Sequence, residues 1–422
     1  MTYATTASTG SSASTTTITG RSTAKLGKLS DHRHHNHHQP LLPGLPDDIA
    51  HLCLSLVPPS ILYSVCRSWR RLIYSPSFPP FLSIYALLFS PQTEDQIPHF
   101  SNSLEFAFFE PISSTWQSLP PPPPDPPLRL LLRHPSFISR NLPIQSVACS
   151  GNLVLLAATT DQFLPALPRP LIFNPLTRKW TLGPPLATPR RWCAAGASCE
   201  TVYVASGIGS HYNPVVARSV ESLNINTSHS NIKDSHHNNQ RNRSLEVGWT
   251  WENMGALRDG KFSREAIEAV GWRRKLCMVN VKGDAAKEGV VYDVESDAWG
   301  DMPEGMLAGW RGPAAAMDED IIYMVDESRG ALRMYEPERD AWVEILQTEE
   351  LRGADNIAAG GGRVCVVCCG GIGIVVVDVV SSPPRLWVVD TPPGFQTMAI
   401  HVLPRMSQPD FQTPVLASTS MD

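Results

Sequence analysis

The sequence has little charge and no marked excess of either sign. Charged residues make up 18% of the 422 residues, and 35 Lys and Arg stand against 40 Asp and Glu. A general nucleic-acid binder usually carries a basic excess, so the net charge of −5 argues against a nucleic-acid partner. A hydrophobic content of 42% provides enough apolar material for one large domain and one small one.

Long apolar runs and paired cysteine motifs are also missing. The longest aliphatic stretch, residues 372–380, is interrupted by Asp378, so the sequence predicts no membrane span. Residues 1–20 are rich in Thr and Ser and lack the apolar core of a secretory signal. The nine cysteines show no regular spacing. We therefore expect reduced thiols in a protein of the cytoplasm, the nucleus or both, without a membrane partner.

Motifs of catalytic, cofactor and metal sites are absent as well. Cys365 and Cys368 have the C-x-x-C spacing, but a structural zinc site needs a second pair of ligands that the sequence does not offer. Gly371-x-Gly373 lies between two apolar runs, whereas a dinucleotide site needs a following helix. The sequence therefore predicts no catalytic residue, no cofactor, no metal site and no enzymatic activity.

Composition divides the chain into segments. Residues 1–40 are rich in Ser, Thr and His, and together with 405–422 they contain too little apolar surface to fold, so both are predicted to be disordered tails. Residues 41–78 form a predicted helical segment, and residues 79–404 form the main domain. A Ser-, Asn- and His-rich stretch at about 222–243 is predicted to be a loop inserted into that domain.

The segment 41–78 predicts two short amphipathic helices separated by prolines. Asp47 and Asp48 stand in the first turn of the first helix, where the helix dipole favours negative charge. Apolar residues then recur at helical spacing in both helices. Two such helices make a small core, and a segment of this kind usually needs a partner.

The main domain reads as short apolar and β-branched runs separated by turn residues, which is typical of an all-β repeat. The clearest repeat is an apolar strand, a polar turn and then a tryptophan. These markers are Trp116, Trp180, Trp251, Trp299, Trp342 and Trp387. The last three steps between them are 48, 43 and 45 residues, which suits a four-stranded propeller blade.

Six markers predict six blades, with each tryptophan packing its blade. The first blade lacks an opening strand, so residues 396–403 are predicted to supply that strand and close the ring. Closure matters because it covers strand edges that would otherwise pair with other chains.

Residues 45–73 resemble the F-box, which begins with Leu-Pro and ends with Val-Cys-x-x-Trp, although the middle is a few residues short. The matching positions, which the resemblance marks as adaptor-binding, are Leu45, Pro46, Asp47, Ile49, Leu52, Val57, Pro58, Val65, Cys66 and Trp69. The downstream repeats resemble kelch motifs, which usually carry a Gly-Gly doublet at the end of the second strand, and Gly370-Gly371 keeps that doublet at this position. Residues 41–404 thus resemble plant F-box/kelch-repeat proteins, and the implied fold is a six-bladed kelch-type β-propeller preceded by a small α-helical F-box.

The resemblance implies a substrate receptor of an SCF-type E3 ubiquitin ligase. The F-box would bind a Skp-type adaptor, and through it a cullin–RING ligase, while the propeller holds a target protein and promotes its ubiquitination by proximity. Two alternatives are a kelch-propeller scaffold without a ligase role and a metal-dependent oxidase built on a propeller.

Polar and aromatic residues recur just before the first strand of successive blades, at positions that form a ring on one face of a propeller. They are Gln145, Arg191, Trp192, Arg264, Trp310, Arg311 and Asn356. Converging arginines suit a carboxylate or phosphate group, and tryptophans can serve as apolar anchors. The pattern predicts a target-binding face for an acidic or phosphorylated segment. Alternatively, the arginines cap strand ends or pair with loop carboxylates.

Overall fold

The computed structural model describes most of the chain between residues 40 and 406. The described residues are 40–55, 57, 62, 65–73, 82–90, 102–111, 113–124, 129–130, 144–160, 164–225, 249–264, 267–282 and 285–406. The two predicted tails therefore fall outside them, except for residues 40, 405 and 406.

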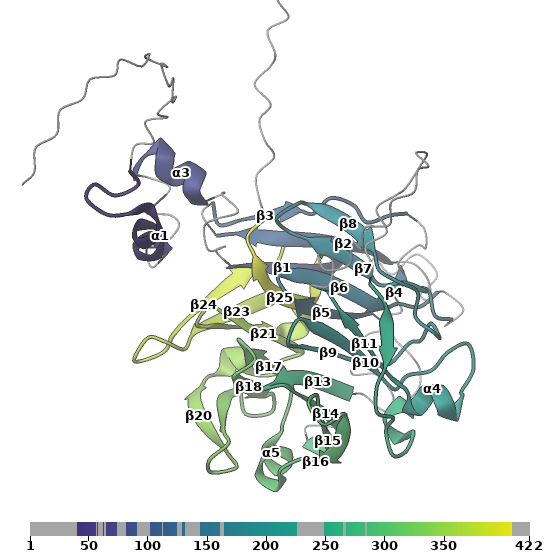
Figure 1. Ribbon diagram of the computed structural model, residues 1–422. Helices are drawn as coiled ribbons and strands as arrows, with labels where there is room; N and C mark the ends of the chain where they lie inside the picture. Colours follow the sequence, from purple (N-terminus) through teal and green to yellow (C-terminus); the bar gives the residue numbers. More distant parts are fainter. Residues whose placement is uncertain are drawn as a thin grey trace, which may run out of the picture.

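Six antiparallel sheets are arranged around a common centre, which Figure 1 shows in a view close to the axis of the ring. The first blade contains β25 (Gln396–Pro404), β1 (Leu82–Phe89), β2 (Asn102–Glu110) and β3 (Thr115–Ser118), with β4 (Arg129–Leu130) paired to β2. The second contains β5 (Gln145–Cys149), β6 (Asn152–Ala157), β7 (Leu171–Asn174) and β8 (Lys179–Leu182). The third contains β9 (Ala194–Ser198), β10 (Thr201–Ala205), β11 (Val220–Asn224) and β12 (Trp251–Asn253).

The remaining three blades follow the same order from the centre outward. The fourth contains β13 (Ile267–Trp272), β14 (Lys275–Lys282), β15 (Ala285–Asp293) and β16 (Ala298–Asp301). The fifth contains β17 (Ala314–Met317), β18 (Ile321–Asp326), β19 (Ala331–Glu336) and β20 (Ala341–Gln347). The sixth contains β21 (Asn356–Gly360), β22 (Arg363–Cys368), β23 (Gly373–Asp378) and β24 (Arg385–Asp390). The prediction of a six-bladed, all-β propeller is confirmed.

Short helices connect some of these strands. They are α4 (Pro214–Arg218), η2 (Lys261–Arg264), α5 (Glu304–Gly309), η3 (Glu349–Leu351) and η4 (Cys369–Gly371). Strand β11 continues to Asn224, which lies inside the predicted loop of about 222–243, and residues 226–248 lie outside the described part.

The ring is closed by β25, the last strand of the chain and the innermost strand of the first blade. It pairs antiparallel with β1, with Ile84 opposite Val402 and Ala86 opposite Ile400. The hydroxyl of Tyr85 donates to the carbonyl of Pro404 at 2.8 Å. Beyond the strand, the guanidinium of Arg405 pairs with the carboxylate of Glu110 at 2.9 Å, and both side chains are buried. The structured chain therefore extends past the predicted start of the tail at residue 405.

All six marker tryptophans lie on the outermost strand of their blade. In five of the blades, the indole nitrogen donates a hydrogen bond to a backbone carbonyl of the preceding blade. The acceptor residue is the last residue of that blade's outermost strand or lies just after it. The pairs are Trp116 with Asp390, Trp180 with Pro120, Trp251 with Pro184, Trp299 with Gly255 and Trp342 with Met306. The tryptophans therefore pack the blades and also tie each of these blades to its neighbour.

The turn before the tryptophan explains the polar part of the repeat. The residue two positions earlier has a left-handed backbone in four blades, with φ of 53° at Ser114, 58° at Arg178, 50° at Asp297 and 46° at Asp340. The carboxylate of Asp340 accepts hydrogen bonds from the Tyr335 hydroxyl at 2.7 Å and from backbone nitrogens of α5. Asp tolerates this backbone and satisfies exposed amides, so it suits the turn.

The core lies between neighbouring blades, so most strands are buried on both faces and read as continuous apolar runs. Strand β22 shows the consequence for the C-x-x-C spacing. Cys365 packs in the cluster between the sixth and first blades, and Cys368 packs in the cluster between the fifth and sixth. Residues three apart in a strand point to opposite faces, so these two thiols cannot share a metal.

The helical segment before the propeller contains α1 (Asp47–Ser55) and α3 (Arg67–Ile73), which Figure 1 shows to one side of the ring. Its small core consists of Leu54, Leu62 and Leu72. No helix among the described residues is long and apolar enough to cross a membrane.

Candidate functional site

The first candidate surface is the outer face of the helical segment. Helix α1 begins after Pro46, whose carbonyl accepts from the Ala50 nitrogen at 2.9 Å. The carboxylate of Asp47 accepts from the Leu41 nitrogen at 3.2 Å, which holds the preceding chain against the helix. Ala50 and Leu54 then face inward and are buried.

Outside this core, the helical segment exposes large apolar side chains. The exposed fractions are 40% for Leu45, 46% for Ile49, 62% for Leu52 and 52% for Val65. Apolar residues recur at helical spacing in α1, but Ile49 and Leu52 do not belong to the segment's own core. Grouped exposed apolar side chains mark interaction sites. We call Leu45, Ile49, Leu52 and Val65 the F-box apolar surface.

The remaining residues of the F-box pattern have different environments. Trp69 is half-buried against the Leu54 cluster, and its indole nitrogen donates to the Leu41 carbonyl at 3.0 Å, so it holds the segment together. Cys66 is exposed, and its sulfur accepts from the Trp69 nitrogen at 3.4 Å. Val57 is half-buried, and Pro58 lies outside the described residues.

The second candidate surface is the channel through the centre of the propeller, with a volume of about 520 Å³. The innermost strands β25, β5, β9, β13, β17 and β21 surround it. Its wall contains many small residues because the inner strands approach closely. A Cβ on Gly271, for example, would lie 1.7 Å from the Ala197 carbonyl oxygen. A side chain on residue 271 is therefore excluded, because even its Cβ would clash with the neighbouring strand.

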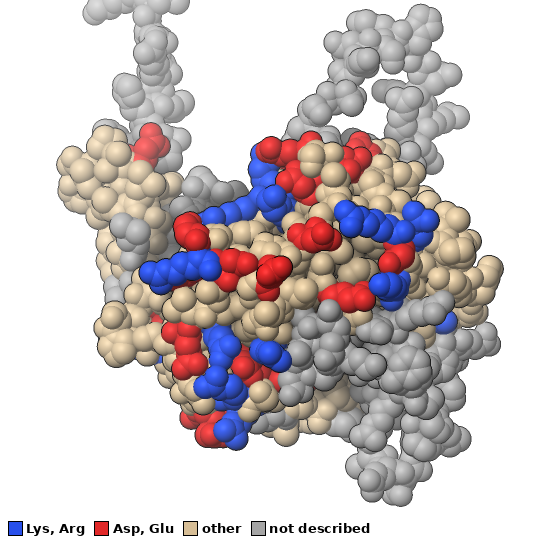
Figure 2. Space-filling model, turned by 90° about the horizontal axis from the view of Figure 1, so that it is seen from below, with Lys and Arg blue, Asp and Glu red and all other residues tan. Residues whose placement is uncertain are grey.

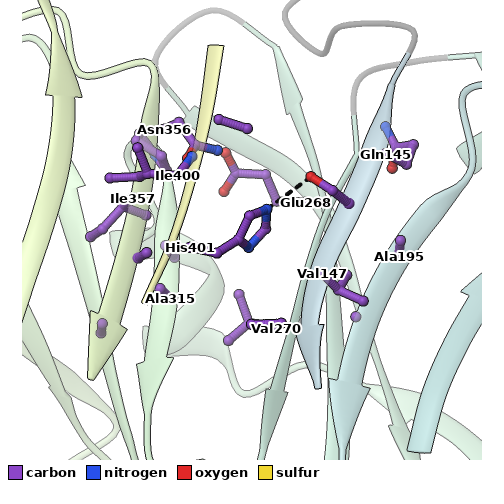
Figure 3. A pocket seen from close by; sticks show the side chains of 18 of the residues that line it. Gln145, Val147, Ala195, Glu268, Val270, Ala315, Asn356, Ile357, Ile400 and His401 are labelled. Carbon is purple, nitrogen blue, oxygen red and sulfur yellow. Dashed lines mark hydrogen bonds between the residues drawn. The ribbon is translucent and has the colours of Figure 1, made fainter. Parts of the chain in front are cut away.

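Polar side chains gather at the end of the channel where the inner strands begin. Gln145 and Asn356 are the first residues of β5 and β21, and Glu268 is the second residue of β13. Figure 3 shows these three at the same end of the channel, with Val147 and Val270 deeper. The side-chain oxygen of Asn356 accepts from the Ile400 nitrogen at 2.9 Å, which fixes the first blade to the sixth.

His401 lies midway along the channel on β25. Its Nε2 forms a hydrogen bond of 2.9 Å with the hydroxyl of Ser146 on β5 (Figure 3). Burial lowers the pKa of His401 to about 4, because the charged ring would lose its hydration. This histidine is therefore neutral at physiological pH.

The predicted ring of target-binding residues is only partly assembled. Gln145 and Asn356 line the channel, whereas Arg191, Trp192 and Arg311 do not. Arg191 forms a backbone bridge with Ile208, and its guanidinium lies 4.4 Å from the centre of the Trp192 ring. Burial lowers the pKa of Arg191 from its usual value. Arg311 is exposed on the connection before β17.

The remaining members of the predicted ring are Arg264 and Trp310. The side chain of Arg264 lies outside the described residues. Trp310 is fully buried, and it packs edge-to-face on Trp342 at 5.7 Å between ring centres. The prediction of an apolar anchor at Trp310 is therefore wrong, because the core between the fourth and fifth blades already encloses this ring.

Sequence reasoning missed the role of Arg190, the neighbour of Arg191. Arg190 is 1% exposed and pairs with the buried carboxylate of Glu221. Its guanidinium also donates to the Ser206 carbonyl at 3.1 Å and to the Ser219 hydroxyl at 2.8 Å. Nothing in the Pro-Arg-Arg-Trp sequence distinguishes the inward arginine from the outward one.

Basic and acidic side chains are mixed on the face of the molecule that Figure 2 shows. Ion pairs of the fourth blade illustrate the mixing, with Arg274 and Glu295 at 2.8 Å and Lys275 and Asp293 at 2.9 Å. A surface of this kind lacks the basic stripe that contacts a phosphate backbone.

The described cysteines form no disulfide. They are Cys53, Cys66, Cys149, Cys193, Cys199, Cys277, Cys365 and Cys368. Burial raises the pKa of Cys277 and of Cys365 to about 12, so these thiols stay protonated. Within the described ranges, no group of three or more His, Cys, Asp or Glu is placed to hold a metal ion.

The described chain is a helical segment with exposed apolar side chains followed by a closed six-bladed β-propeller, and known proteins with this combination are similar to it in sequence. The chain is 51% identical over 377 residues to the F-box/kelch-repeat protein SKIP25 of Arabidopsis thaliana, covering 88% of this chain and 91% of that protein. It is 23% identical over 355 residues to the F-box protein AFR of the same plant, covering 78% and 82%. A match of 54% over 43 residues links it to the Arabidopsis F-box/kelch-repeat protein At1g67480, covering 9% and 11%. No protein-family model matches.

The chain belongs to the F-box/kelch-repeat proteins, because the likeness to SKIP25 spans nearly all of both chains. The predicted resemblance is thereby confirmed. Members of this family are non-catalytic subunits, which agrees with the prediction that the chain has no enzymatic activity.

Proposed function

We propose that this protein is the substrate receptor of an SCF-type E3 ubiquitin ligase, with the F-box bound to a Skp-type adaptor and the propeller holding a target protein. Family membership supports the general role. The observation that carries the assignment to these residues is the F-box apolar surface. Leu45, Ile49, Leu52 and Val65 are 40–62% exposed, although the helices already have a core of their own.

Covering exposed apolar area stabilises a complex. Fully burying a side chain such as Leu or Ile contributes roughly 1.5–3 kcal/mol. Ile49 and Leu52 are 46% and 62% exposed, so covering both with an adaptor would contribute roughly 1.5–3 kcal/mol in total to binding. The isolated segment leaves this area in water.

Chain direction separates the two functional ends of the propeller. Strand β1 begins at Leu82, opposite Pro404 at the end of β25, so the F-box connection enters on the face where the inner strands end. The polar mouth of the channel, with Gln145 and Asn356, lies on the opposite face. A target bound at this mouth would not compete with the F-box connection, and its ubiquitination would follow from proximity.

The free thiols support a reducing compartment, so we place the protein in the cytoplasm, the nucleus or both.

The test is capture of a Skp-type adaptor by the full chain and by an Ile49→Ser/Leu52→Ser variant. We expect the variant to lose capture, because it removes exposed apolar area without opening the core of Leu54. The matched control is Val215→Ser/Ile372→Ser, which removes two apolar side chains that are 74% and 63% exposed on the propeller. Equal capture by all three proteins, with each folded by circular dichroism, would rule out the proposed adaptor surface.

A further inference from the structure

Another cavity of the propeller lies between the third and fourth blades, away from the central channel, with a volume of about 230 Å³. One wall is the connection from β12 to β13, and the other consists of the outer strands β15 and β16. Strand β13 begins at the mouth of the channel, so this connection lies on the face opposite the F-box connection. We call this cavity the side pocket.

The interior of the side pocket is apolar. Leu257 and Phe262 from the connection are buried, and Val290 and Trp299 from the fourth blade are half-buried against the same core cluster. The indole nitrogen of Trp299 already donates to the Gly255 carbonyl at 2.7 Å, and the backbone of Val290 is paired within its sheet. These four residues therefore offer a guest apolar contacts and no free side-chain donor or acceptor.

The walls are held in place without a guest. The backbone nitrogen of Leu257 donates to the Arg218 carbonyl at 2.9 Å, and Nε of Arg218 donates back to the Leu257 carbonyl at 2.9 Å. The bond between Trp299 and Gly255 ties the connection to β16. A preformed pocket loses little conformational freedom when it is filled, so more of the contact energy goes into affinity.

Two exposed ion pairs frame the side pocket. Arg258 and Asp301 are 3.5 Å apart, and Lys261 and Glu288 are 3.3 Å apart, with side chains between 47% and 88% exposed. Each pair joins the connection to the fourth blade. Exposed ion pairs contribute little to stability, so these groups can re-pair with a partner at small cost. An apolar centre inside a polar rim is the usual anatomy of a protein–protein contact.

The volume of the side pocket distinguishes two kinds of guest. Sites for small-molecule ligands usually measure roughly 300–1,000 Å³. A volume of about 230 Å³ instead admits one large side chain whose backbone stays outside. A charged side chain would lose its hydration in this interior without gaining a hydrogen bond from the four apolar residues, so the guest that fits is Leu, Met or Phe.

We propose that the side pocket binds one large apolar side chain of the target protein, while polar residues of the same target segment meet the ion pairs at its rim. This inference rests on the proposed function and specifies the chemistry of the target. Because the connection that forms one wall lies opposite the F-box connection, a target held there leaves the F-box apolar surface open to the adaptor.

The test begins with selection of short peptides from a random displayed library on the full-length protein, followed by fluorescence anisotropy with a selected peptide. We expect the enriched peptides to share one Leu, Met or Phe, and replacing this residue by Ala should weaken binding about tenfold or more. Val290→Phe fills the pocket and should abolish peptide binding. Val290→Thr keeps the shape of the side chain but adds a hydroxyl, so it should weaken binding even where the larger Phe prevents folding.

The matched control is Val388→Phe, which adds the same ring to a valine that is 50% exposed on β24 and should leave peptide affinity unchanged. The inference is overturned if no peptide is enriched, if the enriched peptides bind the Val290 variants as tightly as the original protein, or if their binding does not depend on an apolar residue. Sedimentation analysis of the same proteins tests another occupant. A dimer that Val290→Phe converts to a monomer would assign the pocket to a second copy of this chain, and it would also overturn the inference.

Adaptor capture is measured on the same preparation, and Val290→Phe should leave it unchanged. A protein that captures the adaptor but fails the peptide test retains the proposed function and loses this inference. A protein that captures no adaptor loses the proposed function.

Discussion

The indole nitrogen of Trp116 donates a hydrogen bond to the carbonyl of Asp390 at 2.8 Å, although the two residues are 274 positions apart. Trp116 lies on the outermost strand of the first blade, and Asp390 ends the outermost strand of the last. The same bond joins blades that are consecutive in sequence, as between Trp342 and Met306. The ring is therefore closed at its rim by this bond and at its centre by β25.

Replacing Trp342 by Phe tests the contribution of this bond. The substitution keeps an aromatic ring beside Trp310 but removes the donor to the Met306 carbonyl at 2.9 Å. A typical hydrogen bond contributes about 1 kcal/mol, so the free energy of unfolding should fall by about that amount. The measurement is urea unfolding followed by circular dichroism.

Trp387→Phe is the control, because Trp387 is 40% exposed and its indole nitrogen has no described hydrogen bond. We expect a change below about 0.5 kcal/mol there. Equal losses in both variants would mean that the hydrogen bond at Trp342 is not what stabilises the rim.

The architecture was predictable because it depends on a periodic pattern. Each blade has strands that are buried on both faces, a turn with a left-handed residue and one tryptophan. These features recur along the sequence as a repeat, and this repeat predicts the propeller. Closure by residues 396–403 followed from a count of strands. The lining of the channel was not predictable in the same way. Whether Arg190 or Arg191 turns inward, and whether Trp310 is buried, depends on contacts between blades that no local pattern encodes.

Arg190 and Arg191 should respond very differently to substitution by Met. Removing Arg190 leaves the carboxylate of Glu221, which is 2% exposed, without its partner, and a broken buried ion pair costs about 3–5 kcal/mol. Removing Arg191, which is stacked on Trp192, should cost within about 1 kcal/mol. Thermal unfolding of the two variants gives the comparison.

A second substitution checks the cause. Adding Glu221→Leu to Arg190→Met removes the uncompensated charge, so stability should be partly restored. If the double variant were less stable than Arg190→Met, the loss would instead come from the hydrogen bonds of Arg190 to Ser206 and Ser219.

Stability should depend on pH through His401. Its pKa is about 4 in the folded protein and about 6.5 in an unfolded chain, so between these values the unfolded state binds more protons. The folded state is therefore favoured at neutral pH, and this contribution is lost as the pH falls from about 6.5 toward 4. The full effect is about 3 kcal/mol.

His401→Gln should flatten the profile of unfolding free energy between pH 6.5 and pH 5, a window above the titration range of ordinary carboxyl groups. Glutamine retains a polar group near the Ser146 hydroxyl but does not titrate. A variant with the same slope as the original protein in this window would show that another group is responsible.

Truncation at the C-terminus separates the contributions of the closing strand. A chain that ends at Met406 keeps every described contact of β25, and its unfolding midpoint should match that of the full chain. A chain that ends at Pro404 loses the ion pair of Arg405 with Glu110 and leaves a buried carboxylate, so it should be about 3 kcal/mol or more less stable.

A chain that ends at Phe395 loses β25 altogether. The edge of β1 from Leu82 to Phe89 is then unpaired, and seven of its eight side chains are buried in the intact ring. An exposed apolar edge strand pairs with other chains, so we expect this protein to aggregate, as measured by light scattering. A monomeric, folded protein ending at Phe395 would show that the ring does not need its last strand, and the bond between Trp116 and Asp390 would then be the contact that closes it.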